Sequence, residues 1–190
     1  MYASETTTVE SDKNAAVVPS TPALGSSLFR HVFETEYDYV WASLRRLGTP
    51  ERDREDLVHE VFVRVHKSLE SYDPARPIRP WLFAFVFRVA SEHRRLRRNM
   101  WEQPHADMDR AGAGGEIAAG ESRDLVHRAL DALSETTRPV FVMYELDGFT
   151  MKEIADVLGV ALHTAYSRLK LGRSAFVAKV RELETEGGAA

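Results

Sequence analysis

The sequence predicts an all-α protein made of two small helical domains that are joined by a flexible linker. Apolar side chains recur at steps of three and four residues in several segments, which is the spacing of one helical face. A stretch rich in Gly, Ala and acidic residues, 99–121, separates two groups of such segments. We therefore expect domains at 27–98 and 122–186. Residues 1–26 are rich in Ser, Thr, Ala and Pro without an apolar stripe, so we expect them to be disordered.

Composition excludes several classes of protein. The chain has 190 residues and no cysteine, which rules out disulfides and thiolate metal sites and favours a reducing compartment. The formal net charge is −4, so any binding of nucleic acid depends on local basic patches. No apolar run reaches the roughly 18 residues of a membrane helix, and no secretory segment is recognisable. We expect a cytoplasmic protein without membrane insertion, and nothing in the sequence indicates a cofactor.

The first domain is predicted to contain three helices. The first spans 28–47 and ends at Gly48, and Thr49-Pro50 starts the next segment. The second helix, within 53–72, has an apolar ridge and an opposite charged face, and such a charged face is more often solvated surface than a partner site. The predicted ridge comprises Leu57, Val61, Val65 and Leu69.

A proline-rich loop at 71–80 leads to a third helix that opens at Trp81. Residues 76–98 carry seven arginines and one acidic residue, Glu92. Aromatic residues beside arginines favour single-stranded nucleic acid, because bases stack on rings and phosphates pair with guanidinium groups. Most of the phenylalanines are nevertheless expected in the core, since they recur regularly along the helix. These are Phe83, Phe85 and Phe87.

The second domain is predicted to end in a helix-turn-helix over 150–176. Thr150 and Glu153 form a T-x-x-E capping box, and Gly159 follows the apolar stripe where a left-handed residue ends a helix. Ala155 is small where two helices cross closely. A helix from Ser122 is expected to lead to Ser134, and the segment 135–149 is expected to pack beneath this motif. The second helix of the motif carries Leu162, Ala165 and Leu169 on its predicted buried face.

The second helix of this motif has charge of one sign. From 161 to 181 its charged residues are basic without exception, which is what contact with DNA phosphates requires. The alternative is an ordinary amphipathic hairpin with a solvated basic face. Capping, small-residue spacing and charge together favour DNA binding.

Three segments of the chain resemble the extracytoplasmic-function (ECF) sigma factors, the smallest members of the sigma-70 family. In that family the helix that docks on the β′ clamp helices of RNA polymerase reads D-x-E-D-L-V-Q-E-x-F, which DREDLVHEVF resembles. The helix that reads and melts the −10 element reads W-L-x-x-I-A-x-N-x-x-x-D-x-x-R-R, which is similar to WLFAFVFRVASEHRR. The −35-reading domain ends in E-I-A-x-x-L-G and S-R-L, both of which occur here. The resemblance covers about 28–98 and 123–181.

The resemblance implies a promoter-specificity subunit that is not an enzyme. The implied partners are core RNA polymerase, through the β′ clamp helices and the β flap, promoter DNA, and an anti-sigma factor. Polymerase contacts are expected at Asp53, Asp56, His59 and Glu60. Contacts with the −10 element are expected at Trp81, Arg88, Arg94, Arg95, Arg97 and Arg98. Contacts with the −35 element are expected at His163, Thr164, Tyr166, Ser167, Arg168, Lys170 and Arg173.

The sequence departs from the family pattern at a few positions. His59 stands where Gln is usual, Glu92 where Asp is usual, and Ala165 where Val is usual. Arg88 replaces the usual Asn at a position that reads a −10 base in relatives. An arginine can pair with guanine or with a phosphate, so both roles are open for Arg88.

Two other classes of function compete with this interpretation. The first is a helix-turn-helix regulator of the LuxR type, which would carry a receiver or ligand domain in place of 27–98. The second is a carboxylate metal enzyme, because Asp56-x-x-His59 and Asp124-x-x-His127 echo the acid-x-x-His pairs of di-iron bundles. No further inward Glu pair accompanies them, so surface positions are favoured.

Overall fold

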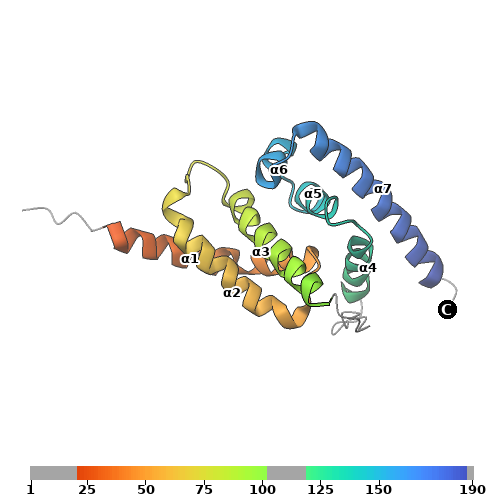
Figure 1. Ribbon diagram of the computed structural model, residues 1–190, viewed down its shortest axis with the longest axis horizontal. Coiled ribbons are helices and arrows are strands. Elements are labelled where there is room, and N and C mark those ends of the chain that lie inside the picture. Colours follow the sequence, from red (N-terminus) through yellow and green to blue (C-terminus); the bar gives the residue numbers. More distant parts are fainter. Residues whose placement is uncertain (1–20, 102–118, 188–190) are drawn as a thin grey trace, which may run out of the picture.

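The regular structure of the chain is helical throughout the part that the computed structural model describes, residues 21–101 and 119–187 (Figure 1). This confirms the predicted all-α class. The predicted N-terminal extension lies outside the described residues as far as residue 20, and so does most of the predicted linker, 102–118. The first unit comprises α1 (Thr21–Arg46), α2 (Glu51–Ser68), the 3₁₀ turn η1 (Leu69–Ser71) and α3 (Ile78–Trp101). The second unit comprises α4 (Ala119–Asp131), α5 (Arg138–Phe141), the π-helical segment η2 (Val142–Leu146), α6 (Met151–Leu158) and α7 (Leu162–Gly187).

The first unit has one apolar core, because α1, α2 and α3 each turn an apolar stripe toward the other two. The four residues of the predicted ridge are all buried, three of them on α2 and the fourth, Leu69, in η1. Burial of each large aliphatic or aromatic side chain contributes about 1.5–3 kcal/mol, which outweighs the weak helix propensity of the β-branched residues among them. The central core residues are Val40, Leu44, Val61, Val65, Leu82, Phe83 and Val86.

Two helices of the first unit begin earlier than the sequence predicted. Helix α1 begins at Thr21, so 21–26 belong to its first turns and not to the disordered extension. Thr21-Pro22 is itself a helix-start signal, since proline is well suited to the first turn. Helix α3 begins at Ile78, which places Pro80 in its first turn, where a missing N–H costs no intrahelical hydrogen bond.

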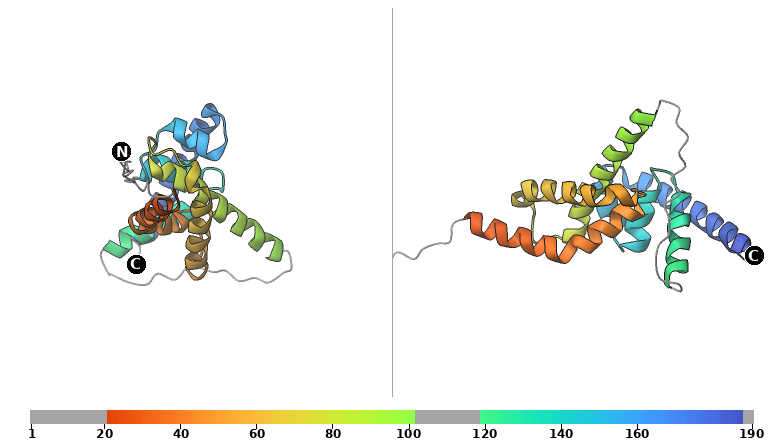
Figure 2. Two further views of the ribbon diagram at one scale, coloured as in Figure 1. Left: turned by 90° about the vertical axis from the view of Figure 1, so that its left-hand side faces the viewer. Right: turned by 90° about the horizontal axis from the view of Figure 1, so that it is seen from below.

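The second unit is built around the helix-turn-helix. Leu130, Val140, Met143 and Ile154 are fully buried beneath α7 and come from four different elements. Helix α7 runs along the outer side of this unit (Figures 1 and 2), and near its C-terminal end Leu183 is buried and Glu186 lies 3.5 Å from Arg128 of α4. Helix α7 is therefore anchored near both ends, although much of its C-terminal half is exposed. None of the described helices combines the length and the apolar character needed to cross a lipid bilayer.

The two units pack against each other, with α3 lying on α6. The rings of Phe83 and Phe149 meet edge to face, with their centroids 6.4 Å apart. Asp147, whose side chain is 3% exposed, accepts hydrogen bonds from the Tyr39 hydroxyl at 3.1 Å and from Arg46 Nη1 at 2.7 Å. Burial raises the pKa of Asp147, while Arg46 opposes this by favouring the carboxylate. The interface thus combines an apolar contact with a buried polar cluster.

A second polar contact covers the turn between α1 and α2. Arg138 Nε donates to the backbone carbonyl of Arg46 at 2.7 Å, and Arg138 Nη2 pairs with Asp131. Gly48 has a φ of 83°, in the left-handed region that glycine adopts without strain. A Cβ at Gly48 would lie 2.5 Å from Arg138 Nη1, so a side chain there would force the Arg138 guanidinium to move.

Candidate nucleic-acid interface

Helices α6 and α7 form the predicted helix-turn-helix, and the local sequence sets both ends of α6. The Glu153 N–H donates to Thr150 Oγ1 at 3.3 Å, and the Thr150 N–H donates to Glu153 Oε2 at 2.8 Å, which completes the predicted capping box. Gly159 ends α6 with a φ of 63°. Ala155 is 7% exposed and lies in the contact between the two helices, where its small side chain permits close packing. The start of α7 is therefore held by a short, fixed turn.

The first turns of α7 present a polar face to solvent. Ala165 and Leu169 are buried and hold the helix against the second unit, while Thr164 and Arg168 are half-buried beside them. A helix seated in this way can enter a major groove with its exposed side chains toward the base edges and phosphates. The exposed candidates on this face are His163, Tyr166, Ser167 and Lys170.

Two residues of α7 differ from what the sequence predicts for their burial or their contacts. Leu162 was expected on the buried face but is 48% exposed, because it is the first residue of α7 and no earlier turn covers it. Arg173 is a candidate phosphate contact, yet its Nε donates to Glu145 at 2.5 Å and its guanidinium lies 5.3 Å from the ring of Tyr144. An anionic ligand of Arg173 would have to compete with Glu145.

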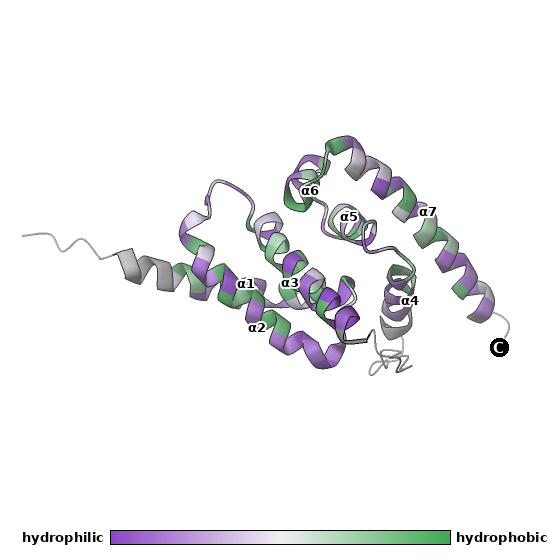
Figure 3. Cartoon of the chain, viewed as in Figure 1, coloured by the Kyte–Doolittle hydropathy of each residue, from purple (hydrophilic) through white to green (hydrophobic). Residues whose placement is uncertain are grey.

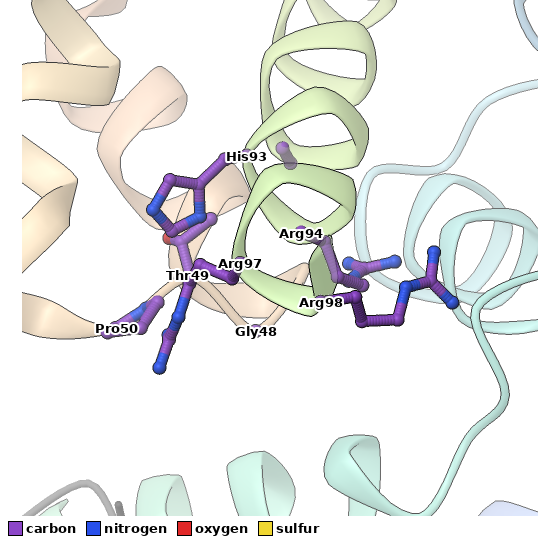
Figure 4. Close-up of a pocket in the computed structure, with 8 residues that line it drawn as sticks. Gly48, Thr49, Pro50, His93, Arg94, Arg97 and Arg98 are labelled. Carbon is purple, nitrogen blue, oxygen red and sulfur yellow. The ribbon is translucent and has the colours of Figure 1, made fainter. Parts of the chain in front are cut away.

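The structure divides the predicted arginine cluster of α3 between three faces. Arg94 and Arg98 are four residues apart and extend from one side of α3 toward the second unit (Figure 4). Arg98 Nη1 lies 3.2 Å from Glu135, and Arg94 Nη1 lies 3.9 Å from the same carboxylate. Arg94 Nη2 also donates to the carbonyl of Leu47 at 2.8 Å. These two candidates for −10 contact therefore face an acidic residue of the second unit.

His93 and Arg97 lie on the other side of α3, beside the turn that precedes α2 (Figure 4). Asp53 is the common acidic neighbour, 3.2 Å from His93 Nε2 and 3.9 Å from Arg97 Nη1. A pocket of about 230 Å³ opens between this turn and the last turns of α3. Its lining consists of Gly48, Thr49, Pro50, Ala90, His93, Arg94, Arg97 and Arg98.

Arg88 and Arg95 are exposed on a third face of α3. Glu92 lies between them in the sequence, and Arg64 of α2 donates to it at 2.6 and 3.2 Å. The hydrogen bond from Arg64, with the positive charges of Arg64, Arg95 and Arg88, lowers the pKa of Glu92 and keeps it ionised. This face is open to a phosphate, because Glu92 is already engaged by Arg64.

Trp81 is half-buried at the start of α3 and belongs to a small aromatic group. Its ring lies 5.0 Å from that of Tyr72 and 4.8 Å from that of Phe85. The Tyr72 hydroxyl donates to the Arg76 carbonyl at 2.6 Å, which ties the preceding loop to this group.

A cleft of about 370 Å³ lies next to the loop, and part of its wall comes from the second unit. The lining residues are Glu36, Pro77, Ile78, Arg79, Pro80, Gly148, Phe149 and Glu153.

The four candidate polymerase contacts on α2 differ in their exposure to solvent. The N-terminal half of α2 is strongly hydrophilic (Figure 3), and Asp56, His59 and Glu60 are exposed there. Glu60 accepts a hydrogen bond from Arg64 at 2.5 Å. Asp53 is only half-exposed and is turned toward His93 and Arg97 of α3. Three of the four predicted positions thus form an open surface.

The next question is whether the two acid-x-x-His pairs of the sequence, Asp56-x-x-His59 and Asp124-x-x-His127, belong to a cluster of metal ligands. Within residues 21–101 and 119–187, no group of three or more His, Asp or Glu side chains is placed to hold a metal ion. Asp124 lies 3.7 Å from Arg45. His127 is surrounded by arginines, a setting that disfavours a further cation.

The surroundings of His127 predict a dependence of stability on pH. Burial, with the positive charges of Arg45, Arg138 and Arg46, lowers the pKa of His127 from 6.5 to about 4, although Asp131 opposes this. Because the folded state favours the neutral imidazole, this stabilisation is complete above pH 6.5 and is lost as the pH falls toward 4. We expect acidification from pH 7.5 to 4.5 to cost about 1–2 kcal/mol through this group, after allowance for solvent screening.

Thermal melts across that range would measure the effect. His127→Gln, which does not titrate, should lose correspondingly less stability on acidification than the wild type. Equal losses in the two proteins would contradict the assignment.

Comparison with known proteins places this geometry in context. The chain matches the family model of sigma-70 region 2 over residues 32–102 and that of sigma-70 region 4 over residues 123–176. It is 28% identical over 162 residues to the ECF RNA polymerase sigma-E factor of Escherichia coli K12, a match that covers 77% of this chain and 84% of the relative. It is 28% identical over 142 residues to the RNA polymerase sigma factor CnrH of Cupriavidus metallidurans, covering 68% and 74% of the two chains.

Two solved structures share the fold. One is CnrH in complex with the cytosolic domain of CnrY, with a TM-score of 0.61, 24% identity, and coverage of 84% of this chain and 94% of that chain. The other is the sigma factor RpoE from Bartonella quintana in complex with the anti-sigma factor NepR, with a TM-score of 0.64, 18% identity, and coverage of 82% and 98%. The region 2 match occupies the part of the chain where a LuxR-type regulator would carry a receiver, so that alternative is not supported.

Proposed function

The chain belongs to the extracytoplasmic-function sigma factors of the sigma-70 family, and we propose that it directs core RNA polymerase to specific promoters. The observation that carries this proposal is that region 2 and region 4 follow each other in one chain. A sigma factor supplies promoter recognition and leaves the chemistry of RNA synthesis to the polymerase. We therefore propose that this protein is not an enzyme and that it acts in the cytoplasm, where the transcription machinery works.

We assign the two promoter elements to the two predicted domains, 27–98 and 122–186. The predicted linker at 99–121 is shorter than expected, because α3 extends to Trp101 and α4 begins at Ala119. The second domain would place α7 in the major groove of the −35 element, with its exposed face toward the DNA. The first would hold the melted −10 strand through the α3 arginines and the aromatic group around Trp81. Unstacking a base costs a few kcal/mol, which stacking and phosphate contacts would offset.

We propose that the exposed acidic surface of α2 docks on core polymerase. Asp56, His59 and Glu60 share an open face of one helix, which suits a partner helix pair with complementary basic residues. The net charge of −4 disfavours strong binding of the free protein to DNA, so polymerase would have to bring it to the promoter. An anti-sigma factor is a further proposed partner, since the RpoE structure is a complex with one.

Run-off transcription with core polymerase tests the proposed function. A template that carries the protein's own upstream promoter should give a defined transcript only when the protein is added. Co-purification with core polymerase should accompany this activity. A purified protein that neither joins core polymerase nor directs initiation on any promoter template would refute the proposal.

Replacement of Lys170 with alanine tests the −35 contact. Lys170 is exposed on the proposed groove-facing side of α7, so its loss should weaken holoenzyme binding to −35 duplexes of different sequence by similar factors. The slope of log K against log salt should fall by about 1, as expected for one phosphate contact.

Arg181→Ala provides the matched control, because Arg181 is exposed near the far end of the same helix. It should leave both the affinity and the salt slope unchanged. Equal effects of the two substitutions would argue against the assigned face.

A further inference from the structure

The pocket beside the turn between α1 and α2 has a basic lining that the first unit alone supplies. Its volume is about 230 Å³, and its lining residues come from the turn at 48–50 and from the last turns of α3. Three of the lining residues are arginines, one is a histidine and none is acidic. In Figure 4 the side chain of Arg97 extends along one side of the pocket, and those of Arg94 and Arg98 extend along the other. The pocket therefore offers several donors to one anion.

Two carboxylates pair with these cations, but neither belongs to the lining of the pocket. Asp53 lies 3.2 Å from His93 Nε2 and 3.9 Å from Arg97 Nη1. Glu135 is shared in the same way by the other two arginines of the pocket. The three guanidinium groups outnumber the two carboxylates, so a net positive charge remains at the pocket even when the imidazole is neutral.

Thr49 contributes an independent feature of the pocket, a buried hydroxyl group without a partner. Thr49 lines the pocket and is only 7% exposed. Its N–H donates to the Leu44 carbonyl at 3.1 Å, and its own carbonyl accepts from Arg54 Nη2 at 3.3 Å. Its Oγ1, in contrast, has no hydrogen-bond partner within the described part of the chain. Buried polar atoms are rarely left unsatisfied, so this hydroxyl indicates that the pocket receives a polar ligand.

The donors and the size of the pocket together match a phosphate group. Guanidinium groups bind phosphate oxygens through paired N–H donors, and a threonine hydroxyl can donate to a further oxygen. Pockets for drug-sized ligands measure roughly 300–1,000 Å³, so this smaller pocket suits phosphate itself or a phosphate on a small carrier. A monoester presents three strong acceptor oxygens to surrounding donors, whereas a nucleic-acid backbone phosphate has two of its oxygens esterified. The enclosed arrangement of donors therefore favours the monoester.

We propose that this pocket is a binding site for free phosphate or a small phosphate monoester. Thr49 and His93 take part in it together with the three arginines. Binding of the ligand goes beyond the proposed function and does not depend on it. The consequence for transcription does rest on the proposed function, because the same arginines are candidates for −10 contact. A bound phosphate would engage them and compete with the −10 strand.

Titration of the full chain with sodium phosphate tests the site, with sodium chloride added to keep the ionic strength constant. The backbone amide signals of Thr49 and Arg97 in nuclear magnetic resonance spectra should shift and saturate, with a dissociation constant of about 1 mM. Sodium chloride alone should leave these signals in place. Absent or non-saturating shifts, or shifts confined to residues outside the pocket, would overturn the proposal.

Thr49→Val replaces the hydroxyl with a methyl group and should weaken phosphate binding about tenfold, because one hydrogen bond to an anion is lost. Ser43→Ala is the matched control, since it removes another buried hydroxyl that lies outside the pocket lining, and it should leave the affinity unchanged. Without phosphate, Thr49→Val should melt at or slightly above the temperature of the wild type, because its hydroxyl has no partner within the described residues. Unchanged phosphate affinity, or a clear loss of stability without phosphate, would contradict the assignment.

Binding of a single-stranded −10 oligonucleotide to the holoenzyme distinguishes the two sources of a phosphate group. In phosphate-free buffer, Thr49→Val and the wild type should bind it equally. Phosphate at ten times its wild-type dissociation constant should weaken this binding about tenfold for the wild type and about twofold for Thr49→Val. If Thr49→Val loses affinity for the oligonucleotide and not for phosphate, the pocket holds a backbone phosphate and the proposal fails. If phosphate binds as expected but the chain neither joins polymerase nor binds DNA, the site stands and the proposed function fails.

Discussion

Replacement of Phe83 with alanine is expected to lower the free energy of unfolding by about 3–5 kcal/mol, the largest loss of stability among our predictions. The Phe83 side chain is fully buried in the first unit, and its ring meets Phe149 of the second unit. Alanine would leave a cavity in one core and remove the apolar contact between the units. The midpoint and slope of a urea titration followed by circular dichroism would measure the loss.

Leu96→Ala is the matched control, because Leu96 lies on the same helix but is largely exposed. It should change stability by less than about 0.5 kcal/mol. A Phe83→Ala protein that loses no more stability than this control would show that the α3 core is packed differently.

Charge reversal at Asp56 is expected to have the largest effect on activity. Asp56 is exposed on the α2 surface that we assign to core polymerase. Asp56→Lys would present a cation where the partner is expected to be basic, which should cost about 2–4 kcal/mol of binding, or a 30- to 1,000-fold loss of affinity. Run-off transcription at limiting protein concentration should fall in proportion.

Glu70→Lys makes the same charge change at an exposed position in η1, just beyond the C-terminal end of α2. This control should retain near wild-type affinity for core polymerase, and both variants should melt at temperatures close to that of the wild type. Equal loss of transcription in the two variants would mean that the docking surface lies elsewhere.

Short-range signals account for the parts of the fold that the sequence predicted well. The capping box of Thr150 and Glu153 and the left-handed Gly159 involve atoms within a few residues, so their geometry follows from local chemistry. The buried ridge of α2 follows from the 3.6-residue period alone. The prediction differs from the structure at Thr21, where the lack of an apolar stripe indicates disorder, and at Pro80, where proline indicates a break although it is tolerated in the first turn of a helix.

The sequence by itself determined the all-α class, the order of the two helical units, and the helix-turn-helix with its exposed basic face, because each depends on side-chain spacing along one segment. Only the tertiary structure decided which arginines of α3 pair with carboxylates of the chain and which are exposed to an external anion. Glu135 reaches Arg98, and Asp147 reaches Tyr39, across large separations in the sequence. Such pairs depend on how two packed units meet, and no local pattern encodes the partner of a charge that lies a hundred residues away.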